Sequence, residues 1–297
     1  MTESAAPALP ANDMPLVSAE WLASHRSQPD LLILDIRSAV DGGRRQAYEE
    51  AHIPGALYSS YTDDGWRAVR GMATGLLPDG ATLKTIFARF GLRPSHHVIV
   101  VSAGTGAGDF SAAARVYWTL RIAGHRRVSI LEGGMAGWRS DPDRPVEAGA
   151  GVQPPAANPY PVSLAPQLRA DVPAIERALA ERDAVLLDSR ALGFFEGRDK
   201  SPQALRPGRL PGAVQIDLTL AFDPASKRLR PLAELQALFA PVRGRPVVHY
   251  CNTGHQAATN WFIMSELLGE GGNSLYDGSM SEWTEDPDRP TAIGPEN

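Results

Sequence analysis

One stretch decides the fold: residues 247–262, with the sequence VVHYCNTGHQAATNWF. Four residues suited to a β-strand, VVHY, run directly into Cys251. A short polar loop, NTGHQ, follows, and apolar residues then recur at helical spacing at Trp261, Met264 and Leu268. The pattern predicts a buried strand, a tight loop and the start of a helix.

Cys251, the only cysteine in the chain, opens this loop. Gly254 permits the positive φ that turns backbone N–H groups towards the inside of the loop. Those groups, together with the positive end of the helix dipole, would stabilise a thiolate. We therefore expect a nucleophilic cysteine here, the alternative being a buried and inert one.

Composition limits the classes of function. A chain of 297 residues is long enough for two domains, each with its own core. The net charge is −5, from 29 Lys and Arg against 34 Asp and Glu, which argues against nucleic acid as a partner. One cysteine excludes an internal disulfide and fits a reducing compartment, so we expect a cytoplasmic protein.

The N-terminal sequence MTESAAPALPANDMP has neither a basic start nor an apolar core. We therefore expect no signal peptide and no membrane anchor, and residues 1–13 are predicted to be a disordered tail. A single cysteine and scattered histidines offer no recognisable zinc spacing. We expect no metal and no cofactor.

Three segments of the first half of the chain recur in the same order in the second half. They are LLILDIR (31–37) and AVLLDSR (184–190), HIPGA (52–56) and RLPGA (209–213), and LEGGMAGWRSDPDRP (131–145) and YDGSMSEWTEDPDRP (276–290). The last pair has a constant offset of 145 residues. Solenoid repeats are about 20–50 residues long, so this spacing indicates two duplicated domains.

Each copy alternates continuous apolar runs with helical segments. The runs LLILD, VIVVS, AVLLD and VVHYC are apolar on both faces, and the helical segments are predicted at 18–24, 83–90, 112–122, 172–182 and 232–239. This alternation predicts an α/β fold in which each domain has a mostly parallel sheet flanked by helices. Ligands of such sheets bind beyond the carboxyl ends of the strands, where VVHY meets Cys251.

The domain boundaries follow from the repeat and from composition. We predict a first domain at residues 14–145 and a second at 168–291. Residues 146–167 between them are rich in Pro, Ala and Gly, which predicts an extended linker over the surface.

The cysteine loop, the LLDSR segment, the HIPGA and RLPGA turns and YDGSMSEW together resemble the tandem rhodanese family of thiosulfate and 3-mercaptopyruvate sulfurtransferases. The resemblance implies that Cys251 takes sulfur from a small anionic donor and holds it as a persulfide. The sulfur then passes to an acceptor, which is a thiol protein such as thioredoxin, a small thiol, or cyanide. Ser102 stands at the corresponding strand end of the first copy. The first copy is therefore expected to be a non-catalytic domain that closes one side of the site.

The mercaptopyruvate branch carries a hydroxyl residue two positions after the cysteine, and an Asp and a His eleven residues apart in the first domain. Thr253, Asp41 and His52 match this pattern, with 52 − 41 = 11. The resemblance implies a catalytic proton relay to the leaving enolate. The alternative is that His52 only caps the HIPG turn and that Asp41 is solvated.

The family arginine that would bind the donor's anion, four residues after the arginine of the DSR motif, is Phe194 here. Arg198 and Arg206 are the candidates to replace it, because arginine can hold a carboxylate through two parallel hydrogen bonds. Solvated positions for both are the alternative. Asp188 and Arg190 are expected to brace the loop, with Arg190 also a candidate to face the anion.

The remaining loop residues, Asn252, Gly254, His255 and Gln256, are expected to contact the donor. His255 either supports the thiolate and the donor or points to solvent. Because Asn252 and Thr253 are neutral, we expect 3-mercaptopyruvate rather than thiosulfate as the better donor.

Two other functions are alternatives to sulfur transfer. A related phosphatase would need a longer loop closed by an arginine, but the sixth residue after Cys251 is Ala257. The other is a non-catalytic rhodanese-type sulfur carrier, sensor or partner-binding module, which the altered anion site at Phe194 leaves open.

Overall fold

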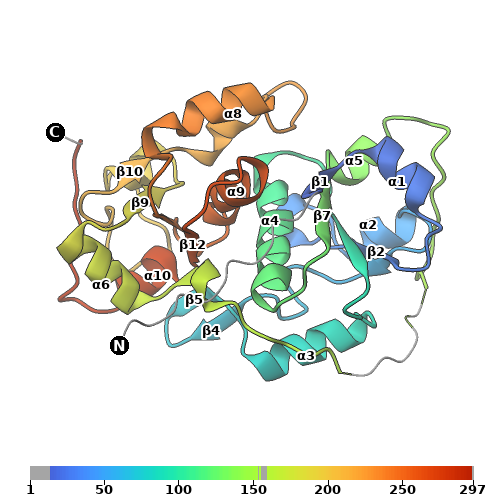
Figure 1. The fold of residues 1–297 in the computed structure, drawn as a ribbon, viewed down its shortest axis with the longest axis horizontal. Coiled ribbons are helices and arrows are strands. Elements are labelled where there is room, and N and C mark those ends of the chain that lie inside the picture. The colour runs from blue at the N-terminus through green and yellow to red at the C-terminus, as the bar shows by residue number, and fades with distance from the viewer. Residues whose placement is uncertain (1–13, 153, 155–158, 296–297) are drawn as a thin grey trace.

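The computed structural model describes residues 14–152, 154 and 159–295, so the predicted N-terminal tail lies outside the described residues. The structure has two five-stranded sheets, one in each half of the molecule, which follow one another along its long axis (Figure 1). Helices pack on both faces of each sheet. All neighbouring strands in both sheets are parallel, which confirms the predicted fold class.

The first sheet has the strand order β1-β7-β6-β2-β3. Its strands are β1 (Leu16–Val17), β2 (Leu31–Asp35), β3 (Leu57–Tyr58), β6 (His97–Val101) and β7 (Val128–Leu131). The helices of this half are α1 (Ala19–His25), α2 (Arg45–Glu50), α3 (Gly80–Arg89), α4 (Ala107–Ile122) and α5 (Gly134–Trp138).

The second sheet repeats this order as β8-β12-β11-β9-β10. Its strands are β8 (Arg169–Ala170), β9 (Val185–Asp188), β10 (Val214–Gln215), β11 (Val247–Tyr250) and β12 (Asn273–Tyr276). The helices are α6 (Val172–Glu181), α7 (Leu192–Phe195), α8 (Leu232–Phe239), α9 (Ala257–Phe262) and α10 (Ser279–Trp283). The matching orders agree with a duplicated unit. The first sheet lies within residues 14–145 and the second within 168–291, while the exact boundaries remain a prediction.

The apolar runs are buried on both faces, as their sequences predict. In β2, Leu32 and Leu34 belong to the core cluster that includes α3 and α4, whereas Ile33 belongs to the cluster on the opposite face. Because successive side chains of a strand point to opposite faces, a run without alternation requires helices on both sides.

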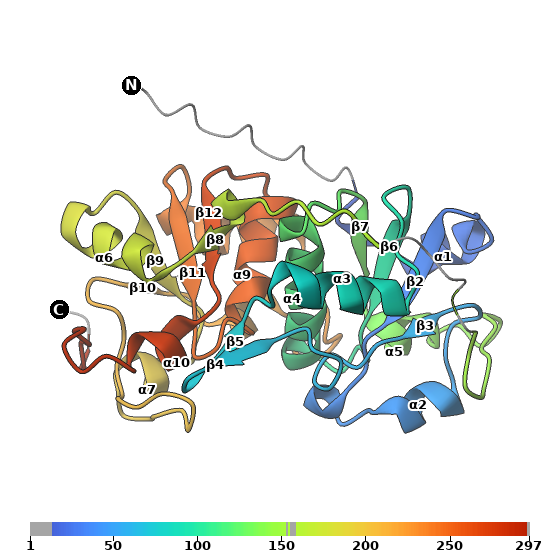
Figure 2. The same ribbon diagram turned by 90° about the horizontal axis from the view of Figure 1, so that it is seen from below.

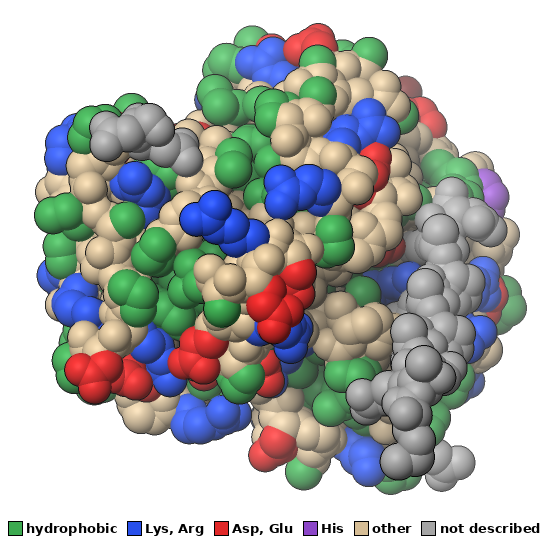
Figure 3. All heavy atoms as spheres, turned by 60° about the vertical axis from the view of Figure 1, so that its left-hand side comes forward, with side chains coloured by type: hydrophobic (Ala, Val, Ile, Leu, Met, Phe, Trp, Pro, Cys, Tyr) green, Lys and Arg blue, Asp and Glu red, His purple; other side chains and the backbone are tan. Residues whose placement is uncertain are grey.

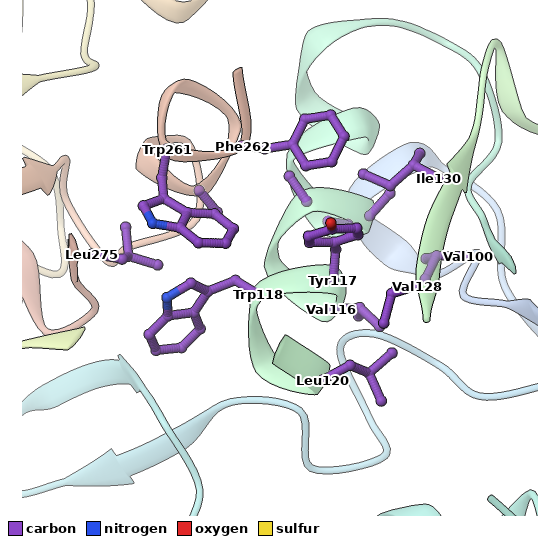
Figure 4. Packing of buried hydrophobic residues seen from close by; sticks show 14 of the residues in the cluster. Val100, Val116, Tyr117, Trp118, Leu120, Val128, Ile130, Trp261, Phe262 and Leu275 are labelled. Carbon is purple, nitrogen blue, oxygen red and sulfur yellow. The ribbon is translucent and has the colours of Figure 1, made fainter. Parts of the chain in front are cut away.

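The two domains share a core rather than merely touching. Tyr117 of α4 packs edge-on against Phe262 of α9, with ring centroids 4.9 Å apart, and Trp118 and Trp261 lie beside them (Figure 4). One continuous cluster extends from Leu32 of the first sheet to residues of the second. The relative position of the domains is therefore fixed by buried apolar contact.

A two-stranded antiparallel hairpin, β4 (Ala68–Arg70) and β5 (Ala73–Leu76), extends from the first domain to α10 of the second (Figure 2). The N–H of Thr74 donates to Ser281 Oγ at 3.2 Å, and the N–H of Leu77 donates to Asp277 Oδ2 at 2.5 Å. No pattern in the sequence predicted this hairpin, which brings first-domain residues to the cysteine loop.

The segment predicted to be a surface linker is tied to the first domain by its described residues. Tyr160 is 4% exposed, packs against Phe87 at 5.3 Å and lies within hydrogen-bonding distance of His125 Nδ1, at 2.9 Å. The N–H of Ser163 donates to Ala123 O at 3.1 Å. The expectation of a linker that runs over the surface is therefore wrong at Tyr160, whose ring belongs to the buried core cluster.

On the face of the second domain drawn in Figure 3, Lys and Arg side chains lie among Asp, Glu and apolar side chains, without one continuous area of a single charge. No helix among the described residues has the length and apolar character needed to cross a membrane.

Candidate active site

Cys251 follows the last residue of β11, which lies between β9 and β12 in the second sheet. The residue is 1% exposed and lines a pocket of about 320 Å³ between the domains. The pocket is lined by Arg67, Thr74, Ala191, Phe194, Gln203, Cys251, Asn252, Thr253, His255 and Gln256. Arg67 and Thr74 come from the first domain, which confirms the prediction that the first copy closes one side of the site.

The backbone of the loop 251–256 is held from below by Ser279. Its Oγ accepts hydrogen bonds from the N–H groups of Cys251 and Gly254, both at 3.0 Å. Gly254 has φ +66°, and a Cβ there would lie 2.5 Å from Asp277 O, so both the conformation and the space require glycine. The loop therefore has a fixed shape.

The other loop N–H groups have no acceptor within the described part of the chain. This applies to the N–H groups of Asn252, Thr253, His255 and Gln256. Because these residues line the pocket, their N–H groups are available to a negatively charged sulfur or ligand.

Arg190 and Asp188 form the predicted structural pair. Arg190 Nε lies 2.9 Å from Asp188 Oδ1 and Nη2 lies 2.6 Å from Oδ2, while Nη1 donates to Asn252 Oδ1 at 3.2 Å. Burial opposes the charge on Arg190, but Asp188 outweighs burial and holds the guanidinium pKa above its ordinary value. Arg190 is absent from the pocket lining, so it braces Asn252 rather than facing the anion.

The two arginines expected to bind the donor do not reach the pocket. Arg198 is exposed and pairs with Glu196 at 2.7 Å. Arg206 donates to the backbone carbonyls of Asp286, Pro287 and Arg289. The expectation that either residue forms the anion site is therefore wrong: Gln203 between them lines the pocket, whereas Arg198 pairs with Glu196 and both Nη groups of Arg206 bond to backbone carbonyls of residues 286–289.

His255 forms part of the wall between the domains. Its Nε2 lies 3.0 Å from Gly108 O, which can only accept, so Nε2 carries the proton and Nδ1 accepts from Tyr61 Oη at 2.9 Å. Burial, with a further contribution from Arg67, lowers the pKa of His255 to about 3. The ring is therefore neutral near pH 7, and it bonds across the interface instead of pointing to solvent.

The structure does not bring the predicted relay together. His52 is 1% exposed, its Nδ1 bonds to Tyr48 O at 2.8 Å, and its ring stacks on Tyr48. Asp41 accepts hydrogen bonds from the N–H groups of Ser38 and Gly43. Both residues stabilise turns of the first domain and neither lines the Cys251 pocket, whereas Thr253 does.

The family model described as "Rhodanese-like domain" matches this chain twice, at residues 18–141 and 172–286. The chain belongs to the rhodanese family. Its relatives include a "Probable 3-mercaptopyruvate sulfurtransferase" of Pseudomonas aeruginosa, 35% identical and covering 94% of this chain and 98% of the relative. A "Thiosulfate sulfurtransferase" of the same organism is 30% identical and covers 95% and 98%.

Solved structures agree with this assignment. The Escherichia coli rhodanese-fold protein SseA, described as a 3-mercaptopyruvate sulfotransferase, aligns with a TM-score of 0.78 and 28% identity over 90% of this chain and 98% of that one. YnjE aligns with a TM-score of 0.82 and 26% identity over 95% of this chain and 69% of its own. The prediction of a sulfurtransferase of the rhodanese family is confirmed.

The corresponding loop of the first rhodanese domain is closed by its own side chain. The carboxylate of Asp109 accepts hydrogen bonds from the N–H groups of Gly104, Thr105 and Gly106. The cavity beside Ser102 measures only about 10 Å³. With a hydroxyl in place of a thiol and the loop N–H groups occupied, this rhodanese domain offers no comparable site.

Several residues of this rhodanese site were missed by sequence reasoning. Arg115 of α4 donates to Gly254 O at 3.2 Å and to Gly75 O at 2.6 Å, which ties the loop to the hairpin. Burial lowers the pKa of Arg115 to about 10, so it stays charged at neutral pH. Arg67, Tyr61 and Ser279 were also missed. All except Ser279, which lies within the repeated YDGSMSEW segment, come from the first domain, where no cysteine marks a site.

Proposed function

We propose that this protein transfers sulfur through a persulfide on Cys251 and that 3-mercaptopyruvate is its preferred donor. The observation that carries this proposal is the position of Cys251 in a pocket whose loop N–H groups lack acceptors in the described part of the chain. Such groups stabilise the thiolate before the reaction and the persulfide anion after it.

The reaction needs no redox partner in the loading step. The Cys251 thiolate attacks the donor's sulfur, an S–S bond forms, and the C–S bond breaks with its electron pair moving to carbon. The resulting enolate takes up the proton that the donor thiol loses, giving pyruvate and a Cys251 persulfide anion. Attack by an acceptor thiolate on the outer sulfur then regenerates the Cys251 thiolate.

Charge favours the monoanionic donor. Within the described part of the chain, Arg67 is the one Lys or Arg that lines the pocket, and the neighbouring loop residues Asn252 and Thr253 are neutral. One cation matches the single carboxylate of 3-mercaptopyruvate, whereas a dianionic thiosulfate would leave one charge unpaired. The name of the relative with 35% identity also supports this donor.

Thr253 is the residue proposed to handle the enolate's proton. Thr253 carries a hydroxyl, lies two positions after Cys251 in the sequence and lines the pocket. Since His52 and Asp41 lie elsewhere, the hydroxyl acts without the relay and passes the proton between the donor's sulfur and carbon. His255, being neutral, helps to form the wall and does not contribute a positive charge.

The proposed acceptor is a small thiol or a thiol protein such as thioredoxin, with cyanide as a laboratory acceptor. A cytoplasmic location remains the expectation from the single cysteine.

Intact-mass measurement after brief mixing with each donor tests the proposal. We expect the protein to gain one sulfur atom with 3-mercaptopyruvate, faster than with thiosulfate, and Cys251→Ser to gain none. A thiol should then remove the sulfur over repeated cycles. Loading without repeated turnover would instead support a sulfur-carrier module, and sulfur transfer by Cys251→Ser would refute the nucleophile.

A further inference from the structure

Arg67 is a cation that lines the active-site pocket, and it forms no ion pair with a carboxylate of the described residues. It precedes β4 of the first-domain hairpin, and its Nη2 donates to Thr253 O at 3.2 Å. Its guanidinium lies over the ring of Tyr61, 5.8 Å from the centroid. Its Nε is buried and has no hydrogen-bond partner among the described residues. A buried donor on a charged group without an acceptor is costly unless a ligand supplies one.

The other arginines near the loop are already engaged. Arg190 is paired with Asp188. Arg115 is bonded to two backbone carbonyls and its Nη2 lies 3.9 Å from Asp277 Oδ2, although its Nε, like that of Arg67, has no hydrogen-bond partner among the described residues. Arg67 differs from both because it lines the pocket together with Cys251.

We propose that Arg67, supplied by the first domain, binds the carboxylate of the sulfur donor and replaces the arginine that the family resemblance places at Phe194. The inference rests on the proposed function for the identity of the donor. It adds the residue that sets the preference for a carboxylate, and it assigns that residue to the domain without the nucleophile.

The surroundings of the pocket fit this role. Phe194 lines the pocket as an apolar wall, so the second domain supplies no charge from that position. The neutral ring of His255 bonds to Tyr61, and Tyr61 in turn lies under the Arg67 guanidinium. Arg67 is thereby held by Tyr61 of the first domain and Thr253 of the second, at the pocket that it lines.

Kinetics of Arg67→Gln test the assignment. We expect KM for 3-mercaptopyruvate to rise about ten- to a hundredfold, the effect of losing one charge-assisted hydrogen bond, with a smaller change in kcat. The KM of Arg67→Lys should lie between that of the parent protein and that of Arg67→Gln. The matched control is Arg198→Gln, an exposed arginine outside the pocket, which should leave KM unchanged. An unchanged KM in Arg67→Gln would overturn the proposal.

A second readout separates anion binding from the identity of the donor. Cys251 is alkylated with iodoacetate, which carries a carboxylate, and with the neutral iodoacetamide. We expect Arg67→Gln to react more slowly with iodoacetate while its rate with iodoacetamide stays close to that of the parent. This difference in alkylation rate is expected even if 3-mercaptopyruvate is not the donor. Equal slowing with both reagents would indicate a structural role for Arg67 and would overturn its role in binding.

Restoring the family arginine provides a gain-of-function test. In the Arg67→Gln background, Phe194→Arg introduces a guanidinium at another position that lines the same pocket. We expect it to recover at least part of the lost preference for iodoacetate. If Phe194→Arg restores nothing while thermal unfolding is unchanged, the two positions do not serve one anion site and the proposed replacement is wrong.

Discussion

Ser279 in the second domain occupies the repeat position of Gly134 in the first, since 279 − 134 = 145, and both have left-handed backbone, with φ +50° and +53°. Glycine adopts this conformation without strain, whereas serine does so at a cost of about 1 kcal/mol or more. The second domain keeps the strained serine because its Oγ accepts the N–H groups of Cys251 and Gly254. A small loss of stability thereby fixes the shape of the active loop.

Replacing Ser279 separates these two effects. Ser279→Ala leaves two buried N–H groups without an acceptor and retains the strain, so we expect a loss of about 1–3 kcal/mol for each N–H group and a lower kcat. Ser279→Gly relieves the strain and should be about 1 kcal/mol more stable than Ser279→Ala, with equally poor activity. Urea unfolding and turnover measure both, with the exposed Ser24→Ala as control. An alanine variant as active as the parent would contradict this account.

Gly75 should be required for docking of the hairpin. It has φ +89°, and an added Cβ would lie 2.2 Å from Thr253 O and 2.6 Å from Arg67 Nη2. We expect Gly75→Ala to displace Arg67 and to lower kcat/KM by at least tenfold. Gly80→Ala is the control, because a Cβ there meets nothing within 4 Å, and at the start of α3 it should be neutral or slightly stabilising. Similar kinetics for both variants would show that the close contact is unimportant.

Thr253 and His52 should differ in their effects on mercaptopyruvate turnover. Thr253→Val removes a hydroxyl from the pocket and should lower kcat about ten- to a hundredfold, a typical effect of losing a proton-transfer group. His52→Gln removes a buried turn residue and should reduce the free energy of unfolding while kcat of the folded enzyme changes little. A large fall in kcat in the His52 variant, with normal stability, would instead support the proton relay through His52.

Buried histidines should make the free energy of unfolding depend on pH. Burial lowers the pKa of His249 and of His125 to about 4. The unfolded chain binds these protons below about pH 6.5 and the folded chain does not, so stability is highest above 6.5 and falls as the pH approaches 4. Each histidine contributes a slope of up to about 1.4 kcal/mol per pH unit in this window.

His249→Gln tests one of these contributions. Glutamine can keep the hydrogen bond that His249 Nε2 makes with Asn273 Oδ1 at 2.7 Å, but it does not titrate. Urea unfolding at pH 7.5, 6.5 and 5.5 should show a shallower loss of stability in this variant than in the parent. Identical slopes would mean that His249 does not contribute to the acid sensitivity.

Apolar runs and apolar spacing in the sequence predicted the fold because they indicate which side chains are buried. The continuous apolar runs became β2, β6, β9 and β11, and the segment after Cys251 became α9. The helix predicted at 232–239 is α8, while α4 begins five residues before the predicted 112, at Ala107. That early start reflects Asp109, whose carboxylate caps the N–H groups of Gly104 and Gly106, a local effect that apolar spacing does not record.

The sequence by itself determined the duplication, the two parallel sheets and the position of Cys251 at a strand end, because each depends on contacts close along the chain or on apolar periodicity. Only the tertiary structure decided which residues share the pocket with Cys251. Arg67 is 251 − 67 = 184 positions away from it, and the hairpin that carries Arg67 reaches the loop because α4 and α9 bury a common core. Spacing and resemblance pointed to Arg198, Arg206 and His52, but these side chains bond to groups outside the pocket. Charge at a site between domains depends on how two surfaces pack, and no local pattern encodes that packing.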